Sequence, residues 1–114
     1  MQKKIVFKGT DHSAPLEEYA NQQLARIEQF LANERTPVYI DLIIEPSKVH
    51  AHHKAQLMVK TPDYDRITSY EGPDFYDALD RVVDTMYLHL HEDKKRKDDD
   101  KKMVGRHEEF KKQR

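Results

Sequence analysis

Two stretches in the middle of the chain alternate between apolar and polar residues, and this pattern constrains the fold most strongly. Side chains of a strand point alternately to opposite faces, so such a stretch predicts a strand with one buried face. Residues 38–45 and 52–60 follow this pattern, and a further strand is expected at 65–71 after the turn Thr61-Pro62-Asp63. Short connections predict an antiparallel meander of these three strands. No apolar set identifies the inward face of 65–71.

Two helices and a short strand are predicted around the meander. Ile5-Val6-Phe7 predicts the strand, and Ser13 is a suitable cap for a helix over residues 14–33. A second helix should begin after Gly72-Pro73-Asp74 and end near residue 93, because apolar residues recur at helical spacing in both segments. The expected fold is α+β, with the order β-α-β-β-β-α. It is a two-layer sandwich in which a four-stranded sheet carries both helices on one face.

Charge divides the chain into two parts. Residues 94–114 contain 10 basic and 5 acidic residues, a net charge of +5, whereas residues 1–93 contain 10 basic and 16 acidic residues, a net of −6. The last stretch also has few apolar residues with which to form a core. We therefore expect a folded domain at 1–93 and a flexible, basic, disordered tail at 94–114.

Composition excludes several classes of protein. The chain has no cysteine, which rules out disulfide scaffolds and thiolate metal sites. No apolar run approaches the roughly 20 residues that a membrane-spanning helix needs, and the N-terminal apolar segment is too short for a signal peptide. We expect a soluble, cytoplasmic protein that contacts no membrane.

No residue pattern indicates a reaction. Glycine-rich phosphate loops and known catalytic motifs are absent from the sequence. His50 and His52 have a spacing that could hold a metal, with His53 beside them, but a solvated histidine cluster explains them better. Asp74, Asp77, Asp80 and Asp84 are likewise better explained as a solvated helix face than as a catalytic array. We expect a binding module with no cofactor, no metal and no small-molecule substrate.

The run Lys94-Lys95-Arg96-Lys97 is the clearest electrostatic feature. Adjacent cations can replace counterions on a phosphate backbone, which would indicate a nucleic-acid partner. Such a run can equally be a solubilising tail whose charge is partly balanced by Asp98-Asp99-Asp100. Composition alone does not choose between these interpretations.

Two helical segments resemble one known family. Asp74-Phe75-Tyr76-Asp77-Ala78-Leu79-Asp80, with Asp84 following, is similar to the start of the last helix in the ribosome hibernation-promoting factor and protein Y family. Ala25-Arg26-Ile27-Glu28-Gln29-Phe30 resembles a segment of that family's first helix. The resemblance covers about residues 1–97, and its element order is the one predicted above.

This resemblance implies a ribosome-binding stress factor of the short form, not an enzyme. Such a protein occupies the decoding channel of the small ribosomal subunit and inhibits translation. Its partners would be that subunit and its rRNA. The residues that match basic positions of the family, and are therefore expected to contact rRNA, are Arg26, Lys94, Lys95, Arg96 and Lys97. We add Lys54, Lys60 and Arg81 because we expect these side chains to be exposed.

The chain also departs from the family pattern. Gln23, Thr85, Leu88 and Glu92 stand at positions that are often basic in relatives. The alternative is therefore a divergent relative that binds a protein partner and has weak or no rRNA affinity. The open side of the sheet, with Tyr39, Ile43 and Met58, could serve such a partner or self-association, so we expect a monomer or a weak homo-oligomer.

Overall fold

The computed structural model describes residues 1–47 and 52–112, and it describes side chains up to residue 98. Six elements follow one another in the predicted order β-α-β-β-β-α, which is confirmed. They are β1 (Gln2–Phe7), α1 (Ala14–Phe30), β2 (Tyr39–Pro46), β3 (His53–Lys60), β4 (Asp65–Gly72) and α2 (Phe75–Lys112).

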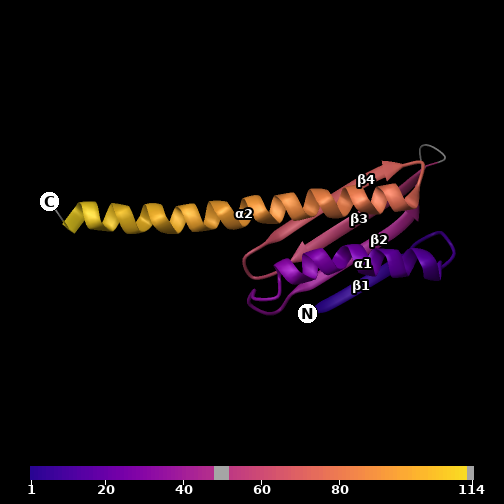
Figure 1. The fold of residues 1–114 in the computed structure, drawn as a ribbon, viewed down its shortest axis with the longest axis horizontal. Coiled ribbons are helices and arrows are strands. Elements are labelled where there is room, and N and C mark those ends of the chain that lie inside the picture. The colour runs from indigo at the N-terminus through magenta and orange to yellow at the C-terminus, as the bar shows by residue number, and fades with distance from the viewer. Residues whose placement is uncertain (48–51, 113–114) are drawn as a thin grey trace.

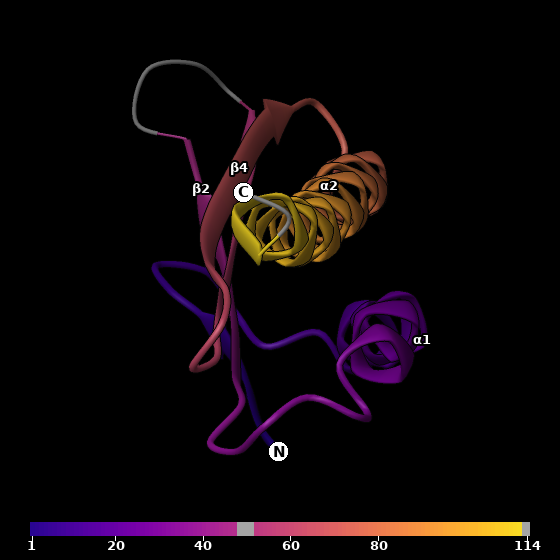
Figure 2. The same ribbon diagram turned by 90° about the vertical axis from the view of Figure 1, so that its left-hand side faces the viewer.

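The four strands form one sheet in the order β1-β2-β3-β4 (Figure 1). β2, β3 and β4 are antiparallel neighbours, as the short turns predicted, and β1 pairs with β2 in parallel. β1 and β2 are parallel because α1 runs back along the sheet, so that β2 begins at the same end of the sheet as β1. Both helices lie on the same face of the sheet, and the opposite face is open in the part of the chain that the structure describes (Figure 2).

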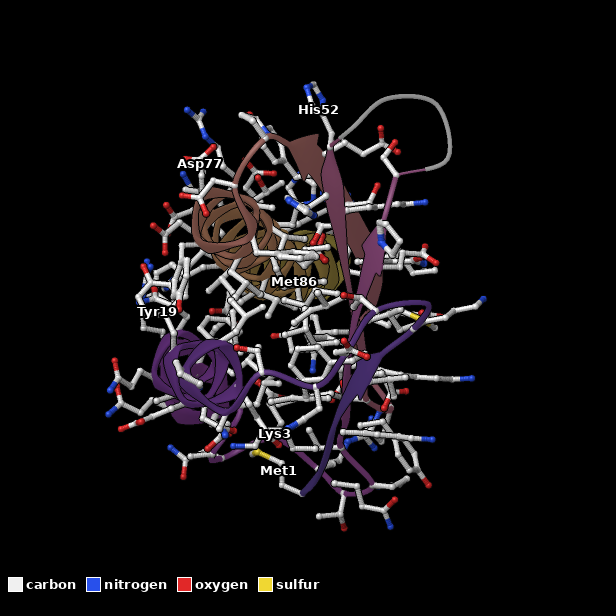
Figure 3. All side chains as sticks on the ribbon, turned by 90° about the vertical axis from the view of Figure 1, so that its right-hand side faces the viewer. Met1, Lys3, Tyr19, His52, Asp77 and Met86 are labelled. Atoms are coloured by element: carbon white, nitrogen blue, oxygen red, sulfur yellow. The ribbon has the colours of Figure 1, made fainter. Side chains whose placement is uncertain are left out.

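The hydrophobic core lies between the sheet and the two helices. Figure 3 shows Met86 in this layer, with Tyr19 and Asp77 on the helical side. The alternating strands supply one side of the core and the helical stripes supply the other, as predicted. Its fully buried large side chains include Leu24, Ile27, Leu31, Ile40, Leu42, Ile44, Leu57, Val59, Leu79, Val82, Met86 and Leu90.

The inward face of β4 is polar, and this explains why its phase was unreadable in the sequence. Thr68 is buried, and its hydroxyl donates to the Val82 carbonyl of α2 over 3.1 Å. Ile67 points to the open face and is 56% exposed. A buried hydroxyl with a hydrogen-bond partner can replace an apolar contact at little cost, so no apolar period marks the inward face of this strand.

The first helix ends earlier than its apolar stripe predicted. Ser13 caps it, because its hydroxyl accepts the Leu16 N–H. At the other end, the amides of Ala32 and Glu34 bond to carbonyls three residues back. These tighter turns follow Phe30, so α1 spans 14–30 rather than 14–33.

The last helix continues well beyond its predicted end near residue 93. Its backbone is helical to Lys112, because residues 94–112 contain no proline and are rich in lysine and other helix-favouring residues. The Arg66 guanidinium holds the Asp93 carboxylate through two hydrogen bonds of 2.6 and 2.8 Å, which joins β4 to α2. The division into a folded domain, 1–93, and a disordered tail, 94–114, remains a prediction.

Substitution of a core leucine should reveal how strongly the two layers depend on each other. Leu24→Ala is expected to lower the free energy of unfolding by about 2–5 kcal/mol, since it removes a fully buried side chain and leaves a cavity. Urea unfolding followed by circular dichroism measures this change. Leu88→Ala is the matched control, because Leu88 is 61% exposed and should change stability by less than about 0.5 kcal/mol. Equal effects of the two changes would contradict the described core.

Candidate nucleic-acid interface

The outer surface of the helical layer is a seam between α1 and α2 that is lined by aromatic rings. Tyr19 and Tyr76 contact edge to face near the start of the helices, with ring centroids 5.0 Å apart. Further along, the Phe30 ring lies 4.6 Å from His91 and 6.2 Å from Tyr87. Successive turns of α1 thus meet successive turns of α2, so the helices run parallel, and the C-terminal turn of α1 meets the middle of α2 at one end of the seam.

The N-terminal half of the seam is acidic, and its carboxylates already have partners. The Tyr19 hydroxyl donates to Asp80 over 2.5 Å, and this hydrogen bond, together with burial, raises the pKa of Tyr19 to about 12. Asp77 pairs with Arg81 one turn later at 3.5 Å, and the Asp74 carboxylate accepts a backbone N–H in the first turn of α2. These contacts explain the row of aspartates as structural and do not assemble a catalytic site.

Arg26, the predicted contact on α1, lies in the middle of the seam. Its Nη1 atom is 2.6 Å from Asp84 Oδ1, and its guanidinium carbon lies 4.7 Å from the centroid of the Tyr87 ring. The side chain is 45% exposed, so a ligand can reach it. Much of its charge is nevertheless balanced by Asp84, and a phosphate would compete with that carboxylate.

The C-terminal half of the seam is hollowed into an open groove of about 590 Å³. Lys94 lies over the Phe30 ring, with its Nζ atom 5.6 Å from the centroid. The groove combines two ammonium groups, two aromatic rings, two side-chain amides and one carboxylate. Its lining residues are Gln29, Phe30, Asn33, His91, Lys94, Lys95 and Asp98.

The other two residues of the basic run point elsewhere. Lys97 Nζ lies 3.1 Å from Asp63 Oδ1 in the turn between β3 and β4, and Arg35 holds the same carboxylate through two hydrogen bonds. The bonds from Arg35 and then Lys97 lower the pKa of Asp63. Arg96 is exposed and, like Lys94 and Lys95, forms no ion pair among the side chains that the structure describes.

The remaining predicted contacts do not lie on the seam. Lys54 and Lys60 are on β3 and point to the open face of the sheet, where Lys54 Nζ is 3.9 Å from Glu45 Oε1. Arg81 is on α2 but lies toward β4, with its guanidinium carbon 5.5 Å from the centroid of the Tyr70 ring. The structure therefore brings Arg26, Lys94 and Lys95 together along the seam and separates Lys54 and Lys60 from them.

The α2 positions that are often basic in relatives lie on the solvent side of the helix. Thr85, Leu88 and Glu92 are exposed, and Leu88 is 61% exposed. Gln23 on α1 is half-buried. In the middle of the seam Arg26 is paired with Asp84, and the positive charge of Lys94 and Lys95 lies where α1 ends beside α2.

Sequence reasoning missed several residues that line the groove. Gln29, Asn33 and His91 are neither lysine nor arginine, so a search for basic runs overlooked them. The spacing of Gln29 and Asn33, four residues apart, places both on one side of the chain as it leaves α1. Gln29 and Asn33 lie beside His91 because α1 and α2 run parallel, and the sequence alone does not reveal that arrangement.

The structure describes some of the histidines that the sequence singled out. His53 stacks against Phe75 with centroids 3.9 Å apart, and His12 bonds to Glu17. His50 lies outside the described residues, so its proposed pairing with His52 stays untested. Within residues 1–47 and 52–98, no three side chains of histidine, aspartate or glutamate gather around a possible metal position. None of the described helices is long and apolar enough to cross a bilayer.

A family model described as sigma 54 modulation protein / S30EA ribosomal protein matches residues 4–98. The chain belongs to this family. The match includes α1, the part of α2 up to residue 98 and the basic run, and it confirms the resemblance that the two helical segments indicated. A comparison with curated proteins finds no match.

Solved structures share the S30EA fold of this chain. The N-terminal domain of Protein Y from Thermus thermophilus has a TM-score of 0.64 at 18% identity, covering 76% of this chain and 91% of that one. A ribosomal subunit interface protein from Coxiella burnetii has a TM-score of 0.66 at 21% identity, covering 82% and 98%. At these identities the likeness shows a common fold.

The Arg66–Asp93 pair should give this S30EA domain a measurable pH dependence. Hydrogen bonds from Arg66 lower the pKa of Asp93, so the pair contributes stability above the unfolded carboxyl pKa of about 4 and loses it as the pH falls through the folded value. Asp93→Asn should therefore lower the free energy of unfolding by about 1 kcal/mol at pH 7, and the difference from wild type should shrink toward pH 2.

Urea unfolding at several pH values measures this difference. Glu18→Gln is the control, since Glu18 is exposed and has no ion pair among the described side chains. A difference between wild type and Asp93→Asn that stays constant from pH 7 to pH 2 would rule out the ion pair as its source.

Proposed function

We propose that this protein binds the small ribosomal subunit through its helical layer, occupies the decoding channel and inhibits translation. Membership of the S30EA family over residues 4–98 is the observation on which the proposal depends. One solved relative is titled a ribosomal subunit interface protein, which supports the same partner. The protein would act as a binding module rather than an enzyme, in the cytoplasm and under stress.

The basic end of the seam is the proposed rRNA contact. Lys94 and Lys95 would neutralise backbone phosphates, and Arg96 would extend the contact along α2. The exposed His91 ring offers a surface on which an unpaired base can stack. The amides of Gln29 and Asn33, which both donate and accept hydrogen bonds, would contact base edges or ribose hydroxyls.

Inhibition would follow from occupancy of the channel alone. Messenger and transfer RNA need the same space, so a rigid domain held there excludes them without any chemical step. The net charge of −6 on residues 1–93 disfavours contact with rRNA over most of the body, whereas the net +5 of residues 94–114 favours it at one end. We therefore expect an orientation in which the C-terminal end of α2 contacts the RNA most closely.

The alternative function is binding of a protein partner with weak rRNA affinity. Its support is the middle of the helical surface, where Leu88 is exposed and Arg26 is balanced by Asp84. Truncation of Leu88 distinguishes the two functions, because it should weaken a protein interface and leave a phosphate-driven one nearly unchanged.

Cosedimentation with purified small subunits over a salt series tests the proposal. The double variant Lys94→Ala/Lys95→Ala should bind more weakly, and its log–log salt dependence should be shallower by about 1.4 to 1.8, since two phosphate contacts are lost. In a cell-free translation assay the same variant should inhibit less at equal concentration.

The matched control is Lys54→Ala/Lys60→Ala, which removes the same charge from the opposite face of the molecule. It should retain the salt dependence of the wild type. Two results would overturn the proposal: absence of the wild type from the pellet at low salt while circular dichroism shows an intact fold, or equal losses in the two double variants.

A further inference from the structure

The open face of the sheet has a regular pattern of charge that the proposed function does not use. Strand register places four side chains side by side in each row across the sheet. The first row from the N-terminal edge is Gln2, Tyr39, Lys60 and Asp65. The next rows are Lys4, Asp41, Met58 and Ile67, and then Val6, Ile43, Gln56 and Ser69.

Charge on this face alternates from strand to strand. β1 contributes Lys4, and β3 contributes Lys54 and Lys60, so both strands are positive. β2 contributes Asp41 and Glu45, and β4 contributes Asp65 and Glu71, so both are negative. The order of charge across the sheet is therefore positive, negative, positive, negative.

Two copies of this face carry complementary charges when one particular two-fold axis relates them. If two sheets pack face to face about an axis parallel to the strands, β1 of one copy covers β4 of the other and β2 covers β3. Each positive strand then lies over a negative strand, and opposite charges meet residue to residue in the row of Glu45 and Lys54. In the other rows Lys60 faces Tyr39, and Lys4 faces Ile67. Glu45 would lie opposite Lys54 of the second copy, and the same contact would occur twice by symmetry.

The other two-fold rotation is unfavourable. An axis perpendicular to the strands would place each strand over its own copy in the opposite direction. Lys54 would then lie opposite Lys60, and Asp65 opposite Glu71, so like charges would meet in both places. Charge thus selects a single arrangement.

The exposed apolar side chains fit the favourable arrangement. Tyr39 is 39% exposed and Ile67 is 56% exposed, and both lie on this face. Met58 of the second copy would lie opposite Asp41, between Tyr39 and Ile43. Tyr39 would pack on the aliphatic part of Lys60, and Ile67 on that of Lys4, as in sheet-on-sheet packing.

We infer that the open face of the sheet binds a second copy of this chain. Strands of 8 residues rise about 26 Å, and four strands spaced about 4.8 Å apart span about 19 Å, which gives a footprint of about 500 Å² per copy. The total of about 1,000 Å² is at the lower limit for a specific complex, so the dimer is weak. Both helical layers face outward in it, and both grooves stay accessible.

Swapping the charges of Glu45 and Lys54 by substitution tests the inference, with all variants made in the full-length chain. Sedimentation velocity from about 5 to about 500 µM should show concentration-dependent dimerisation of the wild type. Lys54→Glu should weaken it at least tenfold, since two acidic groups then oppose each other at two symmetric positions. The double variant Glu45→Lys/Lys54→Glu should return the dissociation constant to within about threefold of the wild-type value.

Arg81→Glu is the matched control, because it makes the same change of charge on the helical side and should leave dimerisation unaffected. Circular dichroism verifies the fold of each variant. A wild type that remains monomeric at the highest concentration overturns the inference. So does a Lys54→Glu variant that dimerises normally, or a double variant that does not recover, and each of these outcomes would leave the face available to a different protein partner.

Discussion

The four-stranded sheet has one apolar face, and covering that face determines most of this structure. Two helices are needed to span four strands, and each must present a continuous apolar stripe. The crossover from β1 to β2 and the antiparallel meander then leave both helices running in the same direction. Because they are parallel and adjacent, their N-terminal turns meet at one end, and the last turn of α1 meets the middle of α2 at the other. The aromatic seam, the acidic half and the basic groove are consequences of that arrangement.

Helix polarity also explains the acidic end of the helical surface. Acidic residues stabilise the first turns of helices through the alignment of peptide dipoles. Glu17 is in the first turn of α1 and Asp77 is in the first turn of α2, and the two first turns lie at the same end of the parallel pair. The basic end has a different origin, because Lys94 and Lys95 lie in the middle of α2, where the helix passes the end of α1.

The sequence predicted the elements well where the hydrophobic period was clear. Alternation in β2 and β3 and the stripes of both helices were sufficient for the fold class and the core. β4 was ambiguous because its inward residue Thr68 is satisfied by a hydrogen bond to Val82, a contact that no local pattern reveals. The end of α2 was misjudged because lack of apolar residues was taken as lack of helix, although lysine-rich segments favour helix without burial.

The candidate site was harder to predict for a related reason. Tyr19 and Asp80 are 61 residues apart in the chain, and Arg26 and Asp84 are 58 apart. Whether a charged residue is available to a ligand depends on such distant partners. Lys54 and Lys60 were expected to be exposed. Lys60 is exposed and Lys54 is half-buried, and only the strand register shows that both face away from the helices.

The continuity of α2 has a geometric consequence for everything beyond the body. A helix fixes both rise and rotation, at about 1.5 Å and about 100° per residue. The backbone from residue 94 to Lys112 therefore inherits its angular phase from the turns anchored by Arg66 and Asp93. Deleting one residue just after this anchor would shorten the projecting helix by very little. It would nevertheless turn every later position by more than a quarter of a revolution, so that the same residues would face a different direction in space.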